Sequence, residues 1–191
     1  PYSSLLGLEL ENTGATVTGS LLSATGAEAV VDWVLLELRN NDAGHTVAAR
    51  RAALVRANGQ VVSPSGETEI PFTANPVGKR LVSRHRNHLA AMTAAAIASN
   101  GQVIDFTVAN TTLYGTSGQK VLGSFRALWP GDVNSNGTVS YTGSTNDRDQ
   151  VLGTIGGMVP TAMINGYSRS DVNMDGVVKY TGTSNDRDVV L

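Results

Sequence analysis

Residues 132–149 read DVNSNGTVSYTGSTNDRD, and residues 171–188 read DVNMDGVVKYTGTSNDRD. The two stretches align without a gap at a spacing of 39 residues, and 12 of their 18 positions are identical. Agreement at that level indicates an internal duplication, so we expect one small structural unit to form twice. Aspartate, asparagine and glycine are prominent among the shared residues, as is typical of oxygen-rich turns.

Both copies open with the pattern D-x-[DN]-x-[DN]-G, in which alternate side chains carry oxygen and face one centre. A hard cation such as Ca²⁺ takes about six to eight oxygen ligands at about 2.3–2.6 Å. Gly137 and Gly176 stand where such a loop turns sharply, and the next residue contributes its carbonyl, so its side chain is free to differ between the copies. The predicted ligands are Asp132, Asn134, Asn136 and the carbonyl of Thr138 in the first copy, and Asp171, Asn173, Asp175 and the carbonyl of Val177 in the second.

The acid that usually closes such a loop, six residues after the glycine, is replaced by Gly143 and Gly182. Acids arrive a few residues later, and Asn146 followed by Asp149 resembles a capping box, which predicts a helix start there. The closing ligands are therefore either Asp147 and Asp186 or Asp149 and Asp188, and the residues alone leave both alternatives open. We also expect Val139 and Val178 to meet in a short antiparallel contact between the two loops.

The competing interpretation is a pair of ordinary Asx turns that bind no ion. The duplication favours metal, because carboxylates clustered this closely repel one another unless a cation neutralises them. Calcium is favoured over magnesium, since every candidate ligand is a protein oxygen in a flexible loop. The sequence therefore predicts two Ca²⁺ sites.

The charges divide the chain near residue 130. Residues 130–191 carry four Lys and Arg against seven acids, all of them aspartate, whereas residues 1–129 carry ten against nine. The turn-forming sequence Trp129-Pro130-Gly131 lies at the change in composition. We therefore predict two domains, residues 1–129 and residues 130–191.

Upstream of that boundary, short runs alternate apolar and polar residues with period two, as half-buried strands do. The run over residues 30–39 is apolar on both faces, which predicts a central strand, and an Ala-rich run over residues 89–98 predicts one short helix. The predicted fold is mainly β: an antiparallel β-sandwich followed by a small module with two calcium loops and short helices. The predicted strands cover residues 16–22, 30–39, 47–57, 79–88, 103–108 and 121–128.

The composition bears on several classes of function. A net charge of −2 argues against a nucleic-acid partner, and we find no apolar run of about 18 residues and no leader, which argues against membrane insertion. There is no cysteine, and no catalytic motif with a nucleophile or a phosphate loop. The pairs Glu9/Glu11 and Glu67/Glu69 are best explained as charged strand edges, so the chain is predicted not to be an enzyme. His85 and His88 lie three residues apart on a predicted strand and so would not converge on a metal.

The segments DVNSNGTV and DVNMDGVV resemble the duplicated calcium loops of dockerin modules. Through VDWVLLELRN, RHRNHL, IDFT and ALWPGDVN, the whole chain resembles a domain pair found near the C-termini of large secreted bacterial surface proteins, an uncharacterised β-sandwich followed by a dockerin-like module. The resemblance implies secretion and display at the bacterial cell surface, not a reaction. Gly143 and Gly182 depart from the dockerin pattern, and a chain ending at Leu191 leaves only a stub of the second helix.

We therefore expect a non-enzymatic, extracellular structural protein, a calcium-stabilised surface or fibre-type subunit that associates with copies of itself as a homo-oligomer or filament, or serves adhesion. The apolar run Leu5, Leu6, Leu8 and Leu10 is either a strand donated to a neighbouring copy or an ordinary first strand. Two alternatives are a dockerin-like attachment module for a cohesin-like receptor and a carbohydrate-binding domain, although aromatic residues make up only 5% of the chain.

Overall fold

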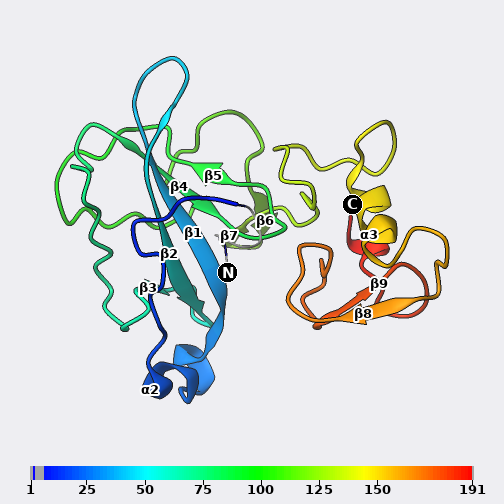
Figure 1. Ribbon diagram of the computed structural model, residues 1–191. Coiled ribbons are helices and arrows are strands. Elements are labelled where there is room, and N and C mark those ends of the chain that lie inside the picture. Colours follow the sequence, from blue (N-terminus) through cyan, green and yellow to red (C-terminus); the bar gives the residue numbers. More distant parts are fainter. Residues whose placement is uncertain (1, 3–6, 191) are drawn as a thin grey trace. The chain divides into compact units, whose positions relative to one another are not determined.

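A computed structural model describes residue 2 and residues 7–190, and it is mainly β with antiparallel sheets and few helices (Figure 1). The chain forms two compact units. The first unit consists of the residues up to His85 together with Ala91–Ser117 and Val121–Ala127. The second unit contains the residues from Leu128 onward together with Arg86–Ala90 and Gly118–Lys120. Two short segments that precede residue 130 therefore belong to the unit that carries the repeat.

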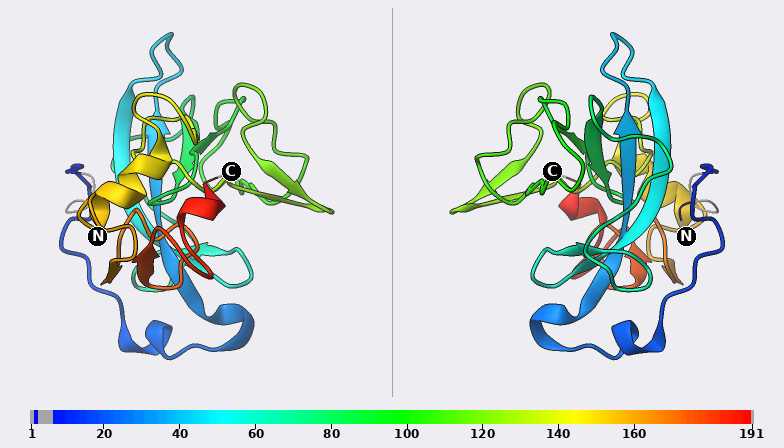
Figure 2. Two further views of the ribbon diagram at one scale, coloured as in Figure 1. Left: turned by 90° about the vertical axis from the view of Figure 1, so that its right-hand side faces the viewer. Right: turned by 90° about the vertical axis from the view of Figure 1, so that its left-hand side faces the viewer.

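The first unit is built on a five-stranded sheet with the order β3-β2-β1-β4-β5. Strand β1 pairs antiparallel with both β2 and β4, so it is the central strand, as the sequence predicted (Figure 2). Its apolar residues on both faces explain this position, because only a strand covered on two sides buries both sets. The strands are β1 (Val30–Arg39), β2 (Val47–Arg56), β3 (Val61–Val62), β4 (Arg80–Arg84) and β5 (Ala91–Met92).

Both faces of this sheet carry apolar clusters. On one face Leu35 and Ala52 pack with Tyr2, and on the other Leu36 and Ala53 pack with residues of the connecting loops. Among the described residues the other sheets are the two-stranded pairs β6–β7 and β8–β9. Their strands are β6 (Lys120–Leu122), β7 (Phe125–Ala127), β8 (Met163–Asn165) and β9 (Val177–Lys179).

Several predicted elements of the first unit were wrong. The run over residues 16–22 contains the short helix α2 (Gly19–Leu22), followed by a 3-10 turn, η1 (Gly26–Glu28). Residues 103–108, all of them described, form no strand, and residues 121–128 form parts of two strands, β6 and β7.

The helix expected over residues 89–98 is also absent from this fully described segment, which contains β5 and loop. Its backbone N–H groups at Thr93 and Ile97 donate to the carbonyls of Leu81 and Lys79, at 2.9 and 2.7 Å. These long-range hydrogen bonds outweigh the weak helix preference of alanine.

The core of the second unit is built from matched positions of the repeat. Val133 and Val172 are equivalent residues, as are Val151 and Val190, and all four are buried in one cluster. Strand β9 pairs with β8, so Val178 lies opposite Ile164. Val139 packs against the cluster that contains Val178 but lies in no strand, so the antiparallel pairing expected between these two valines was wrong. The unit also contains α3 (Asp147–Thr154) and η2 (Arg187–Val189), and η2 starts one residue after the position that corresponds to the start of α3.

Gly131 lies against this core, beside Val139 and Val190, and its φ is +109°. A Cβ at this position would lie 3.0 Å from Cγ1 of Val139 and 3.4 Å from the Cα of Val190. We expect Gly131→Ala to lower the free energy of unfolding of the second unit by about 2–4 kcal/mol, through backbone strain and overpacking. Urea unfolding of the full chain measures this loss in the free energy of unfolding.

Gly156 provides the matched control, because its φ is +101° but nothing lies within 4 Å of its added Cβ. Gly156→Ala therefore carries the backbone cost alone, and a loss as large as that of Gly131→Ala would contradict the packing explanation.

Candidate metal centres

The two loops of the repeat fold alike through short-range hydrogen bonds. In loop 1 (residues 132–138) the Asn134 side chain accepts from the Asn136 N–H at 2.9 Å, and the Asn136 side chain accepts from the Thr138 N–H at 2.8 Å. In loop 2 (residues 171–177) Asn173 and Asp175 accept in the same way, both at 2.9 Å. These are Asx turns, so the local sequence of each copy is enough to shape its loop.

The first aspartate of each loop is buried and reaches across the turn. Asp132 is 2% exposed and Asp171 is 1% exposed. An oxygen of each accepts the N–H of the loop glycine, Gly137 at 3.2 Å and Gly176 at 3.1 Å. The turn thereby wraps around a carboxylate, as a cation-binding loop does.

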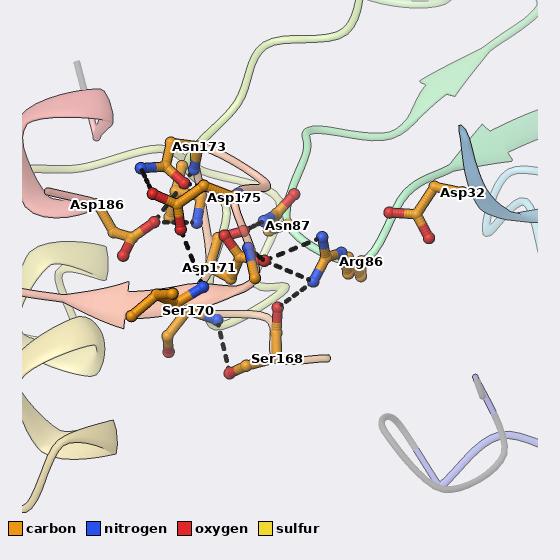
Figure 3. A network of polar contacts seen from close by, with 12 residues as sticks. Asp32, Arg86, Asn87, Ser168, Ser170, Asp171, Asn173, Asp175 and Asp186 are labelled. Carbon is orange, nitrogen blue, oxygen red and sulfur yellow. Dashed lines mark hydrogen bonds and ion pairs between the residues drawn. The ribbon is translucent and has the colours of Figure 1, made fainter. Parts of the chain in front are cut away.

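Asp147 and Asp186 are the second pair of buried aspartates, both at 0% exposure. Asp147 accepts the N–H groups of Asn134 and Ser140, at 3.2 and 2.9 Å. Asp186 accepts three, from Val172, Asn173 and Lys179, at 2.6, 3.1 and 2.7 Å. Each of these carboxylates therefore ties the start of its loop to the chain that follows it, and Figure 3 shows Asp186 beside Asn173.

Asp149 and Asp188, the alternative closing ligands, lie elsewhere. Their side chains are 54% and 58% exposed, and they pair with Arg148 and Arg187 at 2.9 and 2.8 Å. Their backbone N–H groups donate to the side chains of Asn146 and Asn185, at 2.8 and 3.0 Å. Asn146 is the N-cap of α3, so the predicted helix start is confirmed. The geometry brings Asp147 and Asp186, not Asp149 and Asp188, into the loops.

The electrostatics of loop 2 are unfavourable for two buried carboxylates. Burial raises the pKa of Asp186, its three backbone hydrogen bonds lower it, and the charge of Asp171 raises it again, so that its pKa lies above the ordinary value. In addition, the Oδ1 atom of Asp171 is buried and accepts no hydrogen bond from the described residues. A bound cation would satisfy this oxygen and relieve the repulsion.

No group of three or more His, Asp or Glu side chains among the described residues is arranged to hold a metal ion. The predicted set of loop 1 contains only two acids, Asp132 and Asp147, so this finding does not bear on it. The predicted set of loop 2 contains three, Asp171, Asp175 and Asp186, and these three carboxylates are not gathered into such a group. Backbone hydrogen bonds hold the side chains of Asp132, Asn134, Asn136 and Asp147 against loop 1, and those of Asp171, Asn173, Asp175 and Asp186 against loop 2.

Residues 86–90, predicted from the sequence to belong to the first domain, belong to the second unit. Arg86 is 3% exposed, donates to the Ser168 carbonyl at 2.6 Å and forms an ion pair with Asp171 at 3.4 Å. Asn87, which is fully buried, donates to the Asp171 carbonyl at 2.6 Å. The available signal was the basic run at residues 84–88 in a chain whose C-terminal part carries an excess of acids.

The other candidate residues lie in different surroundings. Neither glutamate pair is on a strand, so their interpretation as strand edges was wrong. Glu11 accepts hydrogen bonds from Thr73, and Glu67 accepts hydrogen bonds from the hydroxyls of Ser63 and Ser65. The His85 ring contacts Asp32 at 3.0 Å.

No protein-family model, curated protein or solved structure matches this chain. Within the described part of the chain, none of the helices has the length and apolar character needed to span a bilayer.

Proposed function

We propose that the second unit binds two Ca²⁺ ions, one in each loop of the repeat. The ligands are the residues predicted from the sequence, with Asp147 and Asp186 closing the two shells. The observation that carries this proposal is the occurrence, in both copies of the repeat, of a loop built around buried carboxylates. In the second copy, no described residue donates a hydrogen bond to the Oδ1 atom of Asp171.

The ion-free alternative explains the Asx turns but not the burial. Asx turns form readily at exposed positions, where a carboxylate keeps its hydration. Here four aspartates, Asp132, Asp147, Asp171 and Asp186, are at most 2% exposed. Removing that many carboxylates from water is costly unless cations or hydrogen bonds compensate, and the described residues supply no hydrogen bond to Oδ1 of Asp171 in loop 2.

For the whole chain we propose a non-enzymatic, calcium-stabilised structural protein displayed outside a bacterial cell, which associates with copies of itself or serves adhesion. The resemblance of the repeat to dockerin loops supports the dockerin-like assignment and the extracellular location. The five-stranded sheet with apolar clusters on both faces supports a layered, sandwich-type domain in the first unit.

Self-association through the N-terminal segment belongs to the same proposal. Leu8 and Leu10 pack against Tyr2, Leu35 and Ala52 of their own unit, whereas Leu5 and Leu6 lie outside the described residues. Residues 7–10 form no strand in their own unit, so strand donation would require this segment to leave the apolar cluster that it covers and to pair with a sheet edge of a neighbouring copy.

A second candidate function is attachment to a protein receptor, as in dockerin modules. The observation that favours it is the set of exposed apolar side chains in the second unit, since apolar surface of this kind often marks protein contacts. These side chains are Met158, Val159, Met163, Ile164 and Tyr167.

The proposed function is tested by comparing the stability of the second unit with and without calcium. We expect Ca²⁺ at a hundredfold excess over its dissociation constant to add about 2.7 kcal/mol per site to the stability of the second unit. Hydrogen exchange of peptides from the two units, in EDTA and in calcium, measures the gain in the second unit and uses the first as an internal control. Magnesium at the same concentration should give a smaller gain.

Equal protection of residues 132–190 from hydrogen exchange in EDTA and in millimolar calcium would contradict the proposal.

Sedimentation of the same samples tests self-association, for which we expect larger species in calcium than in EDTA.

A further inference from the structure

A positively charged side chain from a distant part of the chain lies against loop 2. Both terminal guanidinium nitrogens of Arg86 lie 3.4 Å from Oδ2 of Asp171, a residue 85 positions away (Figure 3). The two side chains are 4% and 2% exposed, so the ion pair is buried. Oδ2 of Asp171 also accepts the N–H of Gly176, whereas its Oδ1 accepts no hydrogen bond from the described residues.

The guanidinium group of Arg86 is held in place independently of any ion. It donates to the carbonyl of Ser168 at 2.6 Å, and it lies 4.3 Å from the centre of the Tyr167 ring, within the range of a cation–π contact. The next residue, Asn87, donates to the carbonyl of Asp171 and accepts the N–H of Gly131 at 2.8 Å. Residues 86 and 87 thus clamp the first residue of loop 2 through both its side chain and its backbone.

Loop 2 also carries more negative charge than loop 1, because Asp175 stands where loop 1 has Asn136. The charge of Asp175 is partly balanced by Lys179, whose Nζ atom lies 3.6 Å from it. Asp171 and Asp186 are buried, and Arg86 supplies a fixed positive charge beside the first of them.

We propose that Arg86 is the internal counter-charge of loop 2, a positioning residue that keeps the loop folded without an ion and weakens its affinity for Ca²⁺. The affinity is weakened because an incoming cation must bind Asp171 against a positive charge fixed on the same carboxylate. The statement about calcium rests on the proposed function, whereas the statement about ion-free folding does not.

The ion-free role is tested by a double-mutant cycle in EDTA on the full chain. We expect Arg86→Gln to lower the unfolding midpoint of the second unit by about 10 °C or more, because it leaves the buried Asp171 carboxylate without its partner. Adding Asp171→Asn should restore at least half of that loss, since the neutral amide needs no counter-charge.

Arg187→Gln is the matched control. Arg187 belongs to the same unit and also pairs with an aspartate, Asp188, but its side chain is 30% exposed. We expect it to shift the midpoint by less than about 2 °C. If Arg86→Gln alone does not fold, recovery of folding in the Arg86→Gln/Asp171→Asn double variant supports the proposal, and failure of that recovery overturns it.

The calcium role is measured by titration calorimetry with Ca²⁺ in an Asp132→Asn background, which removes one of the two carboxylates of loop 1 and so weakens calcium binding there. We expect Arg86→Gln to bind Ca²⁺ about tenfold more tightly at loop 2, and Arg187→Gln to bind it as the background protein does. Equal midpoints for the two glutamine variants in EDTA, no rescue by Asp171→Asn, or unchanged or weaker calcium binding in Arg86→Gln would each overturn the proposal.

The two proposals fail separately. If the unsubstituted protein binds no calcium, the proposed function fails while the cycle in EDTA still decides whether Arg86 neutralises Asp171. If calcium binds and the cycle shows no coupling, only the role of Arg86 is rejected.

Discussion

Asp186→Ala is expected to destabilise the second unit by about 3–5 kcal/mol even in EDTA, because three backbone N–H groups, one of them buried and two partly buried, lose their acceptor at once. Those donors belong to Val172, Asn173 and Lys179, which lie at the start of loop 2 and just beyond its end. The carboxylate is fully buried, so water does not replace it without opening the loop. Denaturant unfolding followed by hydrogen exchange of residues 171–190 measures the loss.

Asp188→Ala is the control for this experiment, since it removes the same group two residues further along the chain. The Asp188 side chain is 58% exposed and pairs with Arg187, so we expect a loss below about 1 kcal/mol. Comparable losses from the two substitutions would show that Asp186 does not hold the loop together. In calcium the difference between the two variants should widen, because only Asp186→Ala removes a proposed ligand.

Glu37→Ala is expected to have an effect of similar size on the first unit. Glu37 lies in the middle of the central strand at 0% exposure. Its carboxylate accepts hydrogen bonds from Arg39 at 2.6 Å and Arg50 at 2.9 Å, and Arg84 lies 3.7 Å away. Breaking a buried ion pair by removing one partner costs about 3–5 kcal/mol, since the remaining charges stay where they are poorly hydrated.

Urea unfolding of the full chain measures this loss, with Glu28→Ala as the matched control. Glu28 also pairs with an arginine, Arg56, at 2.7 Å, but its side chain is 56% exposed. An exposed pair of this kind contributes at most about 1 kcal/mol. A loss from Glu37→Ala no larger than that would mean that the three arginines are well solvated without the carboxylate.

The same site has a predictable pH dependence. Burial raises the pKa of Glu37, but hydrogen bonds from Arg50 and Arg39 and the charge of Arg84 lower it by more, so the pKa in the folded protein lies below the ordinary value. A depressed folded pKa means that the stabilisation is present above the unfolded pKa of about 4.3 and is lost as the pH falls towards the folded value.

We therefore expect the first unit to lose stability on acidification below about pH 4.3, and Glu37→Gln to show a shallower loss over the same range. The unfolding midpoints of the unsubstituted protein and of Glu37→Gln are measured between about pH 3 and about pH 7, and their slopes against pH are compared. Parallel curves would contradict the assignment of the pH dependence to Glu37.

The structural features that could be predicted from the sequence are those that depend on residues close together in the chain. Asn134 and Asn173 bond to N–H groups two residues away, so the turn chemistry of the repeat is visible in a few letters. The N-cap at Asn146 is equally local, since its partner is three residues along the chain. The central position of β1 was predictable because its apolar residues point to both faces.

The features that could not be read from the sequence depend on contacts between distant residues. The pattern NDRD offers two aspartates to each loop, and Asp147 is the inward one because it accepts the N–H of Asn134, 13 residues away, whereas Asp149 stays exposed. The Ala-rich segment became strand and loop because hydrogen bonds to Leu81 and Lys79 were available to it.

The ion pair between Arg86 and Asp171 is the extreme case, since it joins residues 85 positions apart. Local patterns specify turns and caps because their hydrogen bonds close within a few residues. The neutralisation of a buried charge depends instead on which distant segment packs against it, and that is a property of the folded chain.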